Sequence, residues 1–375
     1  MPLDPLEFHI SLKRLLAALI LMLVPITVFG FYIGLRADQQ AHEMTGTYFR
    51  ALTRSAARTT AEFVGQRVSE VGFIANDPTL IQSVSAANRS YEHMDTAAIQ
   101  ARAERIDTNW NAPESDRLVQ NVLTSDLALW LRRCRELNPR LLKITVADQT
   151  GATVAATDKP VHYFQTERES WQALQSGGRG ALHVSELRYD DQSKSQYISV
   201  AYPVLQAGTG RFIGAVIGLV DVAPLFSTIY QQQFTQRGRM FLVRDDGIVL
   251  AAPGVTPSMK VKSEEFTAIR DALGTLRGRE AGYLNATLSR GETSVIGFAD
   301  TGLRDAYPNL DWTVIATVSQ RDAFGPMLAL AQYALLIMIV ALLMLTVLGA
   351  YVFLHRKQSL SDLAAPSEGT PRKAA

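Results

Sequence analysis

The sequence contains little cysteine, few charged residues and almost no net charge. Cys134 is the single cysteine among 375 residues, which excludes an intramolecular disulfide framework and a cysteine-rich zinc or iron–sulfur site. Lysine and arginine (37) nearly balance aspartate and glutamate (36), so the net charge of +1 offers no broad basic face to a nucleic acid. We therefore expect no nucleic-acid partner.

Motifs that position catalytic groups are missing from the sequence as well. There is no phosphate-cradling glycine loop, no HExxH metal helix and no GxSxG nucleophile elbow. The glycine-rich stretch 177–180 lacks the Lys-Ser or Lys-Thr of a phosphate-binding loop, and His162 and His183 lack the close spacing of a metal motif. We expect no enzyme activity, no cofactor and no metal.

Apolar residues are present in excess, at 47% against 19% charged residues. Residues 15–35 and 327–354 contain no charged side chain, and at about 1.5 Å per residue each can cross a hydrocarbon core of roughly 30 Å. We predict two transmembrane helices. A secretory signal peptide is the alternative for the first, but its apolar region would be shorter, and no small-x-small cleavage site follows Leu35.

Basic residues next to the two spans predict their orientation. Lys13 and Arg14 precede the first span, and His355, Arg356 and Lys357 follow the second. We expect a two-pass protein of the bacterial inner membrane, with residues 1–14 in the cytoplasm and residues 36–325 periplasmic or extracellular. Residues 355–375 are rich in Ser, Pro, Ala and charge, so we expect a short disordered cytoplasmic tail in place of an output domain.

The segment between the spans predicts an α+β fold. Apolar residues at helical spacing from Asp38 to Asn76 indicate one long helix that ends before Pro78. A strand–turn–strand pattern with a following helix and further strands then occurs once, and a second time about a hundred residues later. We call residues about 80–225 the distal unit and residues about 238–320 the proximal unit. Helices are predicted at 127–137, 170–175 and 263–276, and strands at 142–147, 152–157, 181–188, 196–205, 212–222, 240–244, 248–252, 281–287, 292–299 and 311–318.

This outline resembles the double Cache family of extracytoplasmic sensor domains, in which two PAS-like units are stacked on a long helix between two membrane spans. The resemblance covers roughly residues 36–325. The residues that carry it are 73–78 at the end of the long helix, 147–151 at the start of the distal sheet, 163–171, 214–221 and 311–314. It implies that a small ligand binds in the distal unit.

A subset of the family that binds amino acids shows Tyr-x4-Arg-x-Trp-Tyr, then Tyr-x-Asp, then a lone Asp. Ser170 and Trp171 stand where that subset has Trp and Tyr. The resemblance implies that the arginine holds a carboxylate bidentately and that the acidic groups receive an ammonium. The predicted ligand-binding residues are Tyr163, Arg168, Trp171, Tyr189, Asp191 and Asp221.

Three of these residues also have a purely structural interpretation. Trp171 has the character of a core residue beneath a sheet, and Asp221 would cap a helix that starts near Pro224. Arg168 lies between two glutamates and would then be a solvated charge. The sequence leaves these alternatives open.

The function that the sequence predicts is a membrane-anchored sensor of a small organic solute, amino acid-like or organic acid-like. We expect the sensor to be a homodimer paired through its long helix and to signal through a separate protein such as a kinase or cyclase. The alternative is a structural or scaffolding membrane subunit whose Cache-like units make only protein contacts.

Overall fold

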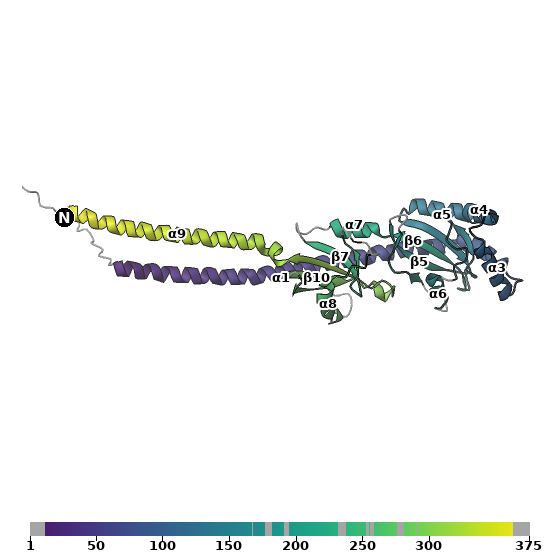
Figure 1. The fold of residues 1–375 in the computed structure, drawn as a ribbon, viewed down its shortest axis with the longest axis horizontal. Coiled ribbons are helices and arrows are strands. Elements are labelled where there is room, and N and C mark those ends of the chain that lie inside the picture. Colours follow the sequence, from purple (N-terminus) through teal and green to yellow (C-terminus); the bar gives the residue numbers. More distant parts are fainter. Residues whose placement is uncertain are drawn as a thin grey trace, which may run out of the picture. The chain divides into compact units, whose positions relative to one another are not determined.

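The computed structural model describes residues 12–362 except for 167, 177–181, 191–194, 232–237, 253–254, 256–258, 276–280 and 290. The chain divides into two compact bodies: a helical body, of which the structure describes residues 12–45 and 320–362, and a sensor body of residues Gly46–Ser319. Figure 1 labels the elements. Helix α1 (Leu12–Ala75) begins in the helical body, and α9 (Gln320–Asp362) follows the last strand of the sensor body directly.

Short capped helices follow α1 in the distal unit. Asp77 ends the break after α1, and its carboxylate accepts a hydrogen bond from the Thr79 N–H at 2.8 Å, which caps α2 (Pro78–Arg89). Asp95 caps α3 (Thr96–Thr108) in the same way through the Ala98 N–H. A 3-10 turn (Pro113–Ser115), α4 (Asp116–Thr124) and α5 (Asp126–Leu137) complete this helical layer.

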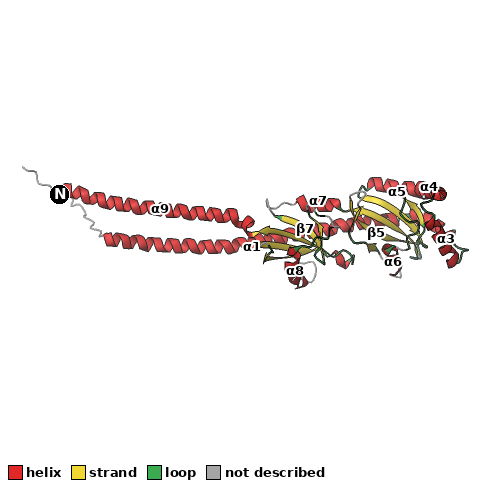
Figure 2. Cartoon of the chain, in the orientation of Figure 1, coloured by secondary structure: helices red, strands yellow, loops and turns green. Residues whose placement is uncertain are grey.

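An antiparallel sheet forms the centre of the distal unit (Figure 2). Its strands are β1 (Leu141–Asp148), β2 (Thr153–Ala156), β3 (His183–Val184), β5 (Ser195–Leu205) and β6 (Phe212–Asp221), in the spatial order β2-β1-β6-β5-β3. Strand β4 (Arg188–Asp190) also pairs with β5. Helix α6 (Glu169–Ser176) packs beside β5 and β3, and α7 (Ala223–Gln231) leads towards the proximal unit.

The proximal unit repeats the plan with a five-stranded antiparallel sheet. Its strands are β7 (Arg239–Arg244), β8 (Val249–Ala251), β9 (Ala281–Thr287), β10 (Thr293–Asp300) and β11 (Trp312–Ser319), in the order β8-β7-β11-β10-β9. Helix α8 (Glu264–Thr275) covers this sheet, and a 3-10 turn (Leu303–Asp305) precedes β11. The core between α8 and the sheet consists of apolar side chains: Phe241, Val243, Val249, Phe266, Ile269, Ile296, Phe298 and Ile315.

Within the sensor body, α1 packs closely against both sheets at glycines. A Cβ on Gly297 of β10 would lie 2.7 Å from the Cβ of Phe49, and a Cβ on Gly218 of β6 would lie 2.8 Å from Val71. Real Cβ atoms do not approach so closely, so these positions admit only glycine without a shift of the helix. The glycines therefore set the helix-to-sheet distance.

The α+β fold with one long helix and two antiparallel sheets is as the sequence predicts. The break at residues 76–78 and the duplicated strand–turn–strand units are confirmed. One strand prediction is wrong: residues 182–188 do not form a single strand, and Ala181 lies outside the described residues. They contain the two-residue β3 and the start of β4. Between the two strands the Ser185 N–H donates to the Ser199 carbonyl, but the Ser199 N–H donates to the side-chain Oγ of Ser185, which interrupts the regular ladder.

In the part of the chain that the structure describes, no helix combines the length and the mean hydropathy needed to cross a bilayer. Pro25 lies inside α1.

The packing of α1 generates a stability prediction. Substitution Gly297→Ala forces a methyl group against Phe49, and we expect the free energy of unfolding to fall by about 1–3 kcal/mol. Gly65→Ala is the matched control, because no atom lies within 4 Å of its added Cβ and alanine favours the helix by about 0.5–1 kcal/mol. Urea unfolding followed by tryptophan fluorescence measures both. Equal stability of the two variants would contradict the packing described here.

Candidate functional site

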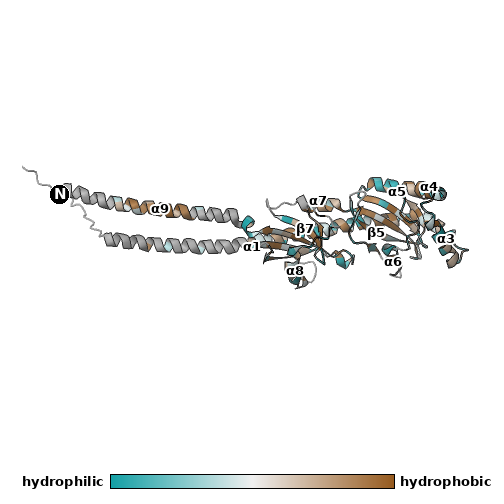
Figure 3. Cartoon of the chain, in the orientation of Figure 1, coloured by the Kyte–Doolittle hydropathy of each residue, from teal (hydrophilic) through white to brown (hydrophobic). Residues whose placement is uncertain are grey.

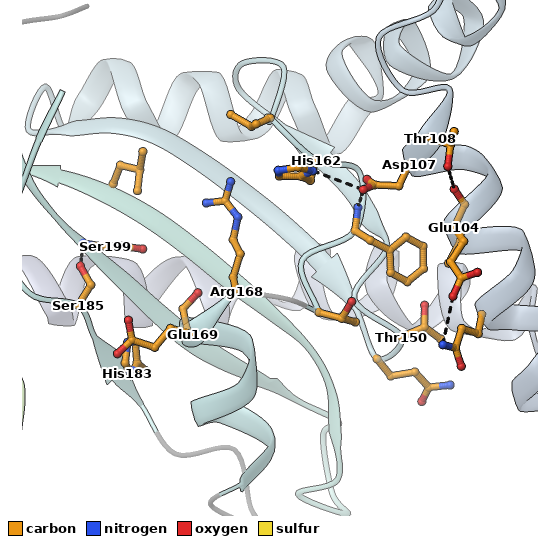
Figure 4. A pocket seen from close by; sticks show the side chains of 18 of the residues that line it. Glu104, Asp107, Thr108, Thr150, His162, Arg168, Glu169, His183, Ser185 and Ser199 are labelled. Atoms are coloured by element: carbon orange, nitrogen blue, oxygen red, sulfur yellow. Dashed lines mark hydrogen bonds and ion pairs between the residues drawn. The ribbon is translucent and has the colours of Figure 1, made fainter. Parts of the chain in front are cut away.

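A cavity of about 1460 Å³ opens in the distal unit. Its walls come from α3, the β1–β2 turn, residues 161–166 and 168–170, strands β3, β4 and β5, and Leu219 of β6. Figure 4 shows the side chains that line it. A cavity of this size holds a small organic molecule with room for water.

The β1–β2 turn positions one wall of the cavity. The buried Asp148 carboxylate accepts hydrogen bonds from the Thr150 N–H at 2.9 Å, the Thr150 hydroxyl at 2.7 Å and the Ala152 N–H at 3.1 Å. Burial raises the pKa of Asp148, and these hydrogen bonds oppose the shift. Gly151 closes the turn with φ +87°, where a side chain would be strained.

Helix α3 forms the acidic side of the cavity. Asp107 accepts the backbone N–H groups of Tyr163 at 2.7 Å and Phe164 at 3.1 Å, and its second oxygen lies 3.4 Å from the imidazole Nδ1 of His162. These contacts hold residues 162–164 against the helix (Figure 4). One turn earlier, Glu104 accepts a hydrogen bond from Gln100 at 3.2 Å. The carboxylate of Asp107 is therefore largely occupied within the protein.

The opposite side of the cavity is cationic. Arg168 precedes α6, is partly buried, and makes no side-chain hydrogen bond or ion pair with any residue that the structure describes. Burial lowers the pKa of Arg168, and the nearby positive charge of Arg188 lowers it further. Arg188 itself lies 3.5 Å from Glu169, with both side chains more than half exposed, so this ion pair is weak.

His183 of β3 is buried beside these arginines. It is 8% exposed, and its Nε2 atom has no hydrogen-bond partner among the described residues. Burial lowers the pKa of His183; Glu169 opposes the shift and Arg188 adds to it. A buried polar nitrogen at a cavity wall is a suitable contact for a bound molecule.

Two of the predicted ligand-binding residues belong to the core. Trp171 is 1% exposed and packs with Ala147, Leu174, Ala201, Ala215 and Ile217, its ring 5.7 Å from that of Phe212. Tyr163 is buried against Trp110, with ring centroids 5.2 Å apart, and burial raises the pKa of its hydroxyl. Trp171 is therefore packed as a core residue, which agrees with its structural interpretation.

Asp221 and Tyr189 are not among the residues of the described cavity wall. Asp221 accepts the Ala223 N–H at 2.9 Å at the start of α7, and its other oxygen lies 3.7 Å from Arg140. Asp221 thus acts as a helix cap, as its structural interpretation proposed. Tyr189 lies in β4 and is absent from the described wall, whereas Asp191 lies outside the described residues.

Of the predicted residues, Arg168 is the one that the structure places in the cavity wall. Sequence reasoning did not assign a binding role to His183, Ser185, Arg188 and Ser199, which also line it. A signal for two of them was present, since His183 and Ser185 alternate along a predicted strand and such residues share one face of a sheet. The sequence did not reveal which face of this strand lines the cavity, because that depends on the order of the strands in the sheet.

Two antiparallel α+β units on one helix, with a ligand-sized cavity in the first, are the architecture of a sensory ligand-binding domain. A profile of the Cache domain, of the double Cache type, matches residues 37–327. The chain belongs to this family.

Solved structures with a similar fold come from chemoreceptors. The sensory domain of a Campylobacter jejuni chemoreceptor is similar with a TM-score of 0.50 and 14% identity, covering 76% of this chain and 97% of that one. The ligand-binding domain of the Pseudomonas aeruginosa amino acid chemoreceptor PctC, in complex with GABA, has a TM-score of 0.46 and 16% identity, covering 73% and 99%. Because the sequence identity is 14%, the similarity to the Campylobacter jejuni domain shows the fold alone.

The cap at Asp221 generates a prediction that separates structure from binding. Asp221→Ala removes the acceptor for the Ala223 N–H, and we expect the free energy of unfolding to fall by about 0.5–2 kcal/mol. Asp221→Asn keeps a capping oxygen and should lose less. Chemical denaturation measures both. A variant Asp221→Ala as stable as the parent would contradict the capping role.

His183 generates a prediction for pH dependence. Because its pKa is lowered in the folded chain, the unfolded chain binds a proton at this imidazole at higher pH than the folded chain does. The parent should therefore lose stability as the pH falls below the ordinary value of 6.5, and His183→Gln should lose less. Unfolding free energies at about pH 8 and about pH 5 give this difference.

His93→Gln is the control for the His183 measurement, because it removes an exposed imidazole. An identical loss of stability on acidification in the parent and in His183→Gln would show that burial does not hold His183 neutral.

Proposed function

We propose that the chain is a sensor that binds a small organic solute, amino acid-like or organic acid-like, in the cavity of the distal unit. The observation that carries this proposal is Arg168, whose partly buried guanidinium faces the cavity with no anionic partner among the described residues. A desolvated charge without a partner is costly in a protein, and a bound anion would offset that cost. Arg168 thus lowers the stability of the ligand-free protein, and binding of an anion would restore that stability.

The surroundings of Arg168 indicate which part of a ligand the site would hold. A guanidinium binds a carboxylate through two parallel hydrogen bonds, and Arg188 adds a second positive charge nearby. The ammonium partner expected at Asp221 is engaged as a helix cap and with Arg140 instead. These contacts support recognition of the carboxylate of the ligand more than recognition of an ammonium.

The proposal includes a two-pass anchor in the bacterial inner membrane, formed by residues 15–35 and 327–354, with residues 36–325 periplasmic or extracellular. The described side chains of α9 support it, since Leu335, Ile337, Leu343 and Leu348 are each about half exposed or more and Figure 3 colours this stretch as apolar. Apolar side chains exposed around a helix favour lipid as their surroundings. The basic residues beside both spans support cytoplasmic ends.

Partners also belong to the proposal. Met44, Tyr48 and Phe73 of α1 are exposed apolar residues, and they support pairing of two long helices in a homodimer. A separate protein such as a kinase or cyclase would then read the ligand-dependent change. A ligand biases such a change only by binding one state of the sensor more tightly.

The scaffold alternative keeps one observation in its favour. Trp171 and Tyr163, two residues of the predicted ligand set, pack into apolar clusters and are therefore explained without a ligand. The open cavity is not explained by protein contacts alone, and neither is Arg168, which has no ion-pair partner among the described residues. Both observations favour the sensor.

A thermal-shift screen of the purified full-length chain tests the proposed function. We expect a hit among organic acids and amino acids, and a ligand at a hundredfold its dissociation constant should add about 2.7 kcal/mol of stability. Arg168→Gln should abolish the shift, whereas Arg211→Gln, an exposed arginine in the β5–β6 turn, should retain it. Silence across organic acids, amino acids, amines, sugars and purines would favour the scaffold.

A further inference from the structure

The edge of the distal sheet at residues 183–188, which we call the edge segment, contacts two different parts of the sensor body. His183, Ser185 and Arg188 line the cavity. Val184 and Glu186, which alternate with His183 and Ser185, contact the proximal unit instead. Contacts with the cavity and contacts with the proximal unit thus occur within six residues of one short segment.

The contacts with the proximal unit are specific and polar. The side-chain amide of Asn309 donates a hydrogen bond to the Val184 carbonyl at 3.0 Å, and Arg244 Nη1 lies 3.0 Å from Glu186 Oε2. Asp246 also binds the Arg244 guanidinium and fixes its direction. Burial raises the pKa of Tyr307, two residues before Asn309, and Tyr202 of the distal sheet adds to the shift.

Both proximal contacts are joined to the strand that leaves the sensor body. Asn309 lies in the turn that leads into β11, and Arg244 pairs across the sheet with Trp312, the first residue of β11. Strand β11 ends at Ser319 and α9 begins at Gln320 without a loop. A displacement of the edge segment would therefore act on the first residues of β11, the strand that continues into α9.

Helix α1 joins the two units by a second route, but from the other face of the distal sheet. Along β6, Gly214 and Gly218 face α2 and α1, while Leu219 faces the cavity. Alternate residues of a strand point to opposite faces of the sheet. The sheet therefore separates the cavity from α1, whereas the edge segment contacts the cavity directly.

We propose that the edge segment transmits occupancy of the cavity to the proximal unit, through Val184–Asn309 and Glu186–Arg244. This inference rests on the proposed function for the identity of the occupant. An anion that contacts His183 and Arg188 favours one position of the segment, and the two polar contacts pass that preference to β7 and β11. The strength of this coupling is the difference between the affinities of the occupant for the two positions of the edge segment.

A covalent occupant tests the transmission independently of the natural ligand. Ser199→Cys, in a full-length Cys134→Ala background, places a thiol in the cavity wall, and 2-sulfonatoethyl methanethiosulfonate attaches a small anion there. Hydrogen–deuterium exchange is then read in peptides that cover 239–244 and 303–319. We expect labelling to change exchange in these peptides by about fivefold or more, the lower end of typical coupling.

The double variant Glu186→Ala with Asn309→Ala removes the side-chain groups that make both contacts. It should abolish the exchange change in the proximal unit, while labelling measured by intact mass stays complete. Arg304→Gln is the matched control, because it removes an ion pair with Asp311 inside the proximal unit and should respond as the parent does. A neutral reagent, methyl methanethiosulfonate, reports what thiol modification does without the anion.

Three results would overturn the inference. An unchanged response in the double variant would assign the transmission to another route such as α1. No proximal response in the fully labelled parent would show that the units are not coupled through the cavity, and loss of the response in Arg304→Gln would show that the effect is not specific to the edge segment. The ligand screen decides the proposed function separately, because the covalent occupant needs no natural ligand.

Discussion

Helix α1 lies so close to both sheets of the sensor body that glycines replace side chains at the points of contact. Gly297 meets Phe49 in the proximal unit, and Gly218 meets Val71 in the distal unit. One helix thereby fixes one face of each sheet, and the remaining face of the distal sheet is free to carry α6 and the cavity. The position of the candidate site follows from this packing, since a side chain at Gly218 would displace the sheet.

The cavity combines a positively charged side with an acidic helix whose charge is largely used within the protein. Asp107 is occupied by backbone N–H groups, whereas Arg168 has no partner among the described residues. Within the part of the chain that the structure describes, Arg168 is thus a partly desolvated cation at the cavity wall without a compensating anion. Sites for anions are made in this way, and the edge segment that supplies Arg188 and His183 also contacts the proximal unit.

Local signals made most of the fold predictable, and contacts between distant elements made the site harder to predict. The end of α1 follows from Asp77 and Pro78, because a cap and a proline act on adjacent residues. Asp221 matched a family pattern, yet the start of α7 next to it engages its carboxylate. His183 entered no prediction of ligand binding, because its place in the cavity wall depends on β3 pairing with β5 at the sheet edge.

Native mass spectrometry of the full-length chain, after incubation with a small-molecule extract of bacterial cells, tests whether the cavity is the sensory site. We expect the parent to retain a small molecule that carries a carboxylate. We expect Arg168→Gln, which should be at least as stable as the parent, to retain none. Retention of the same molecule by both chains, or of none by the parent, would contradict the assignment of the cavity as the sensory site.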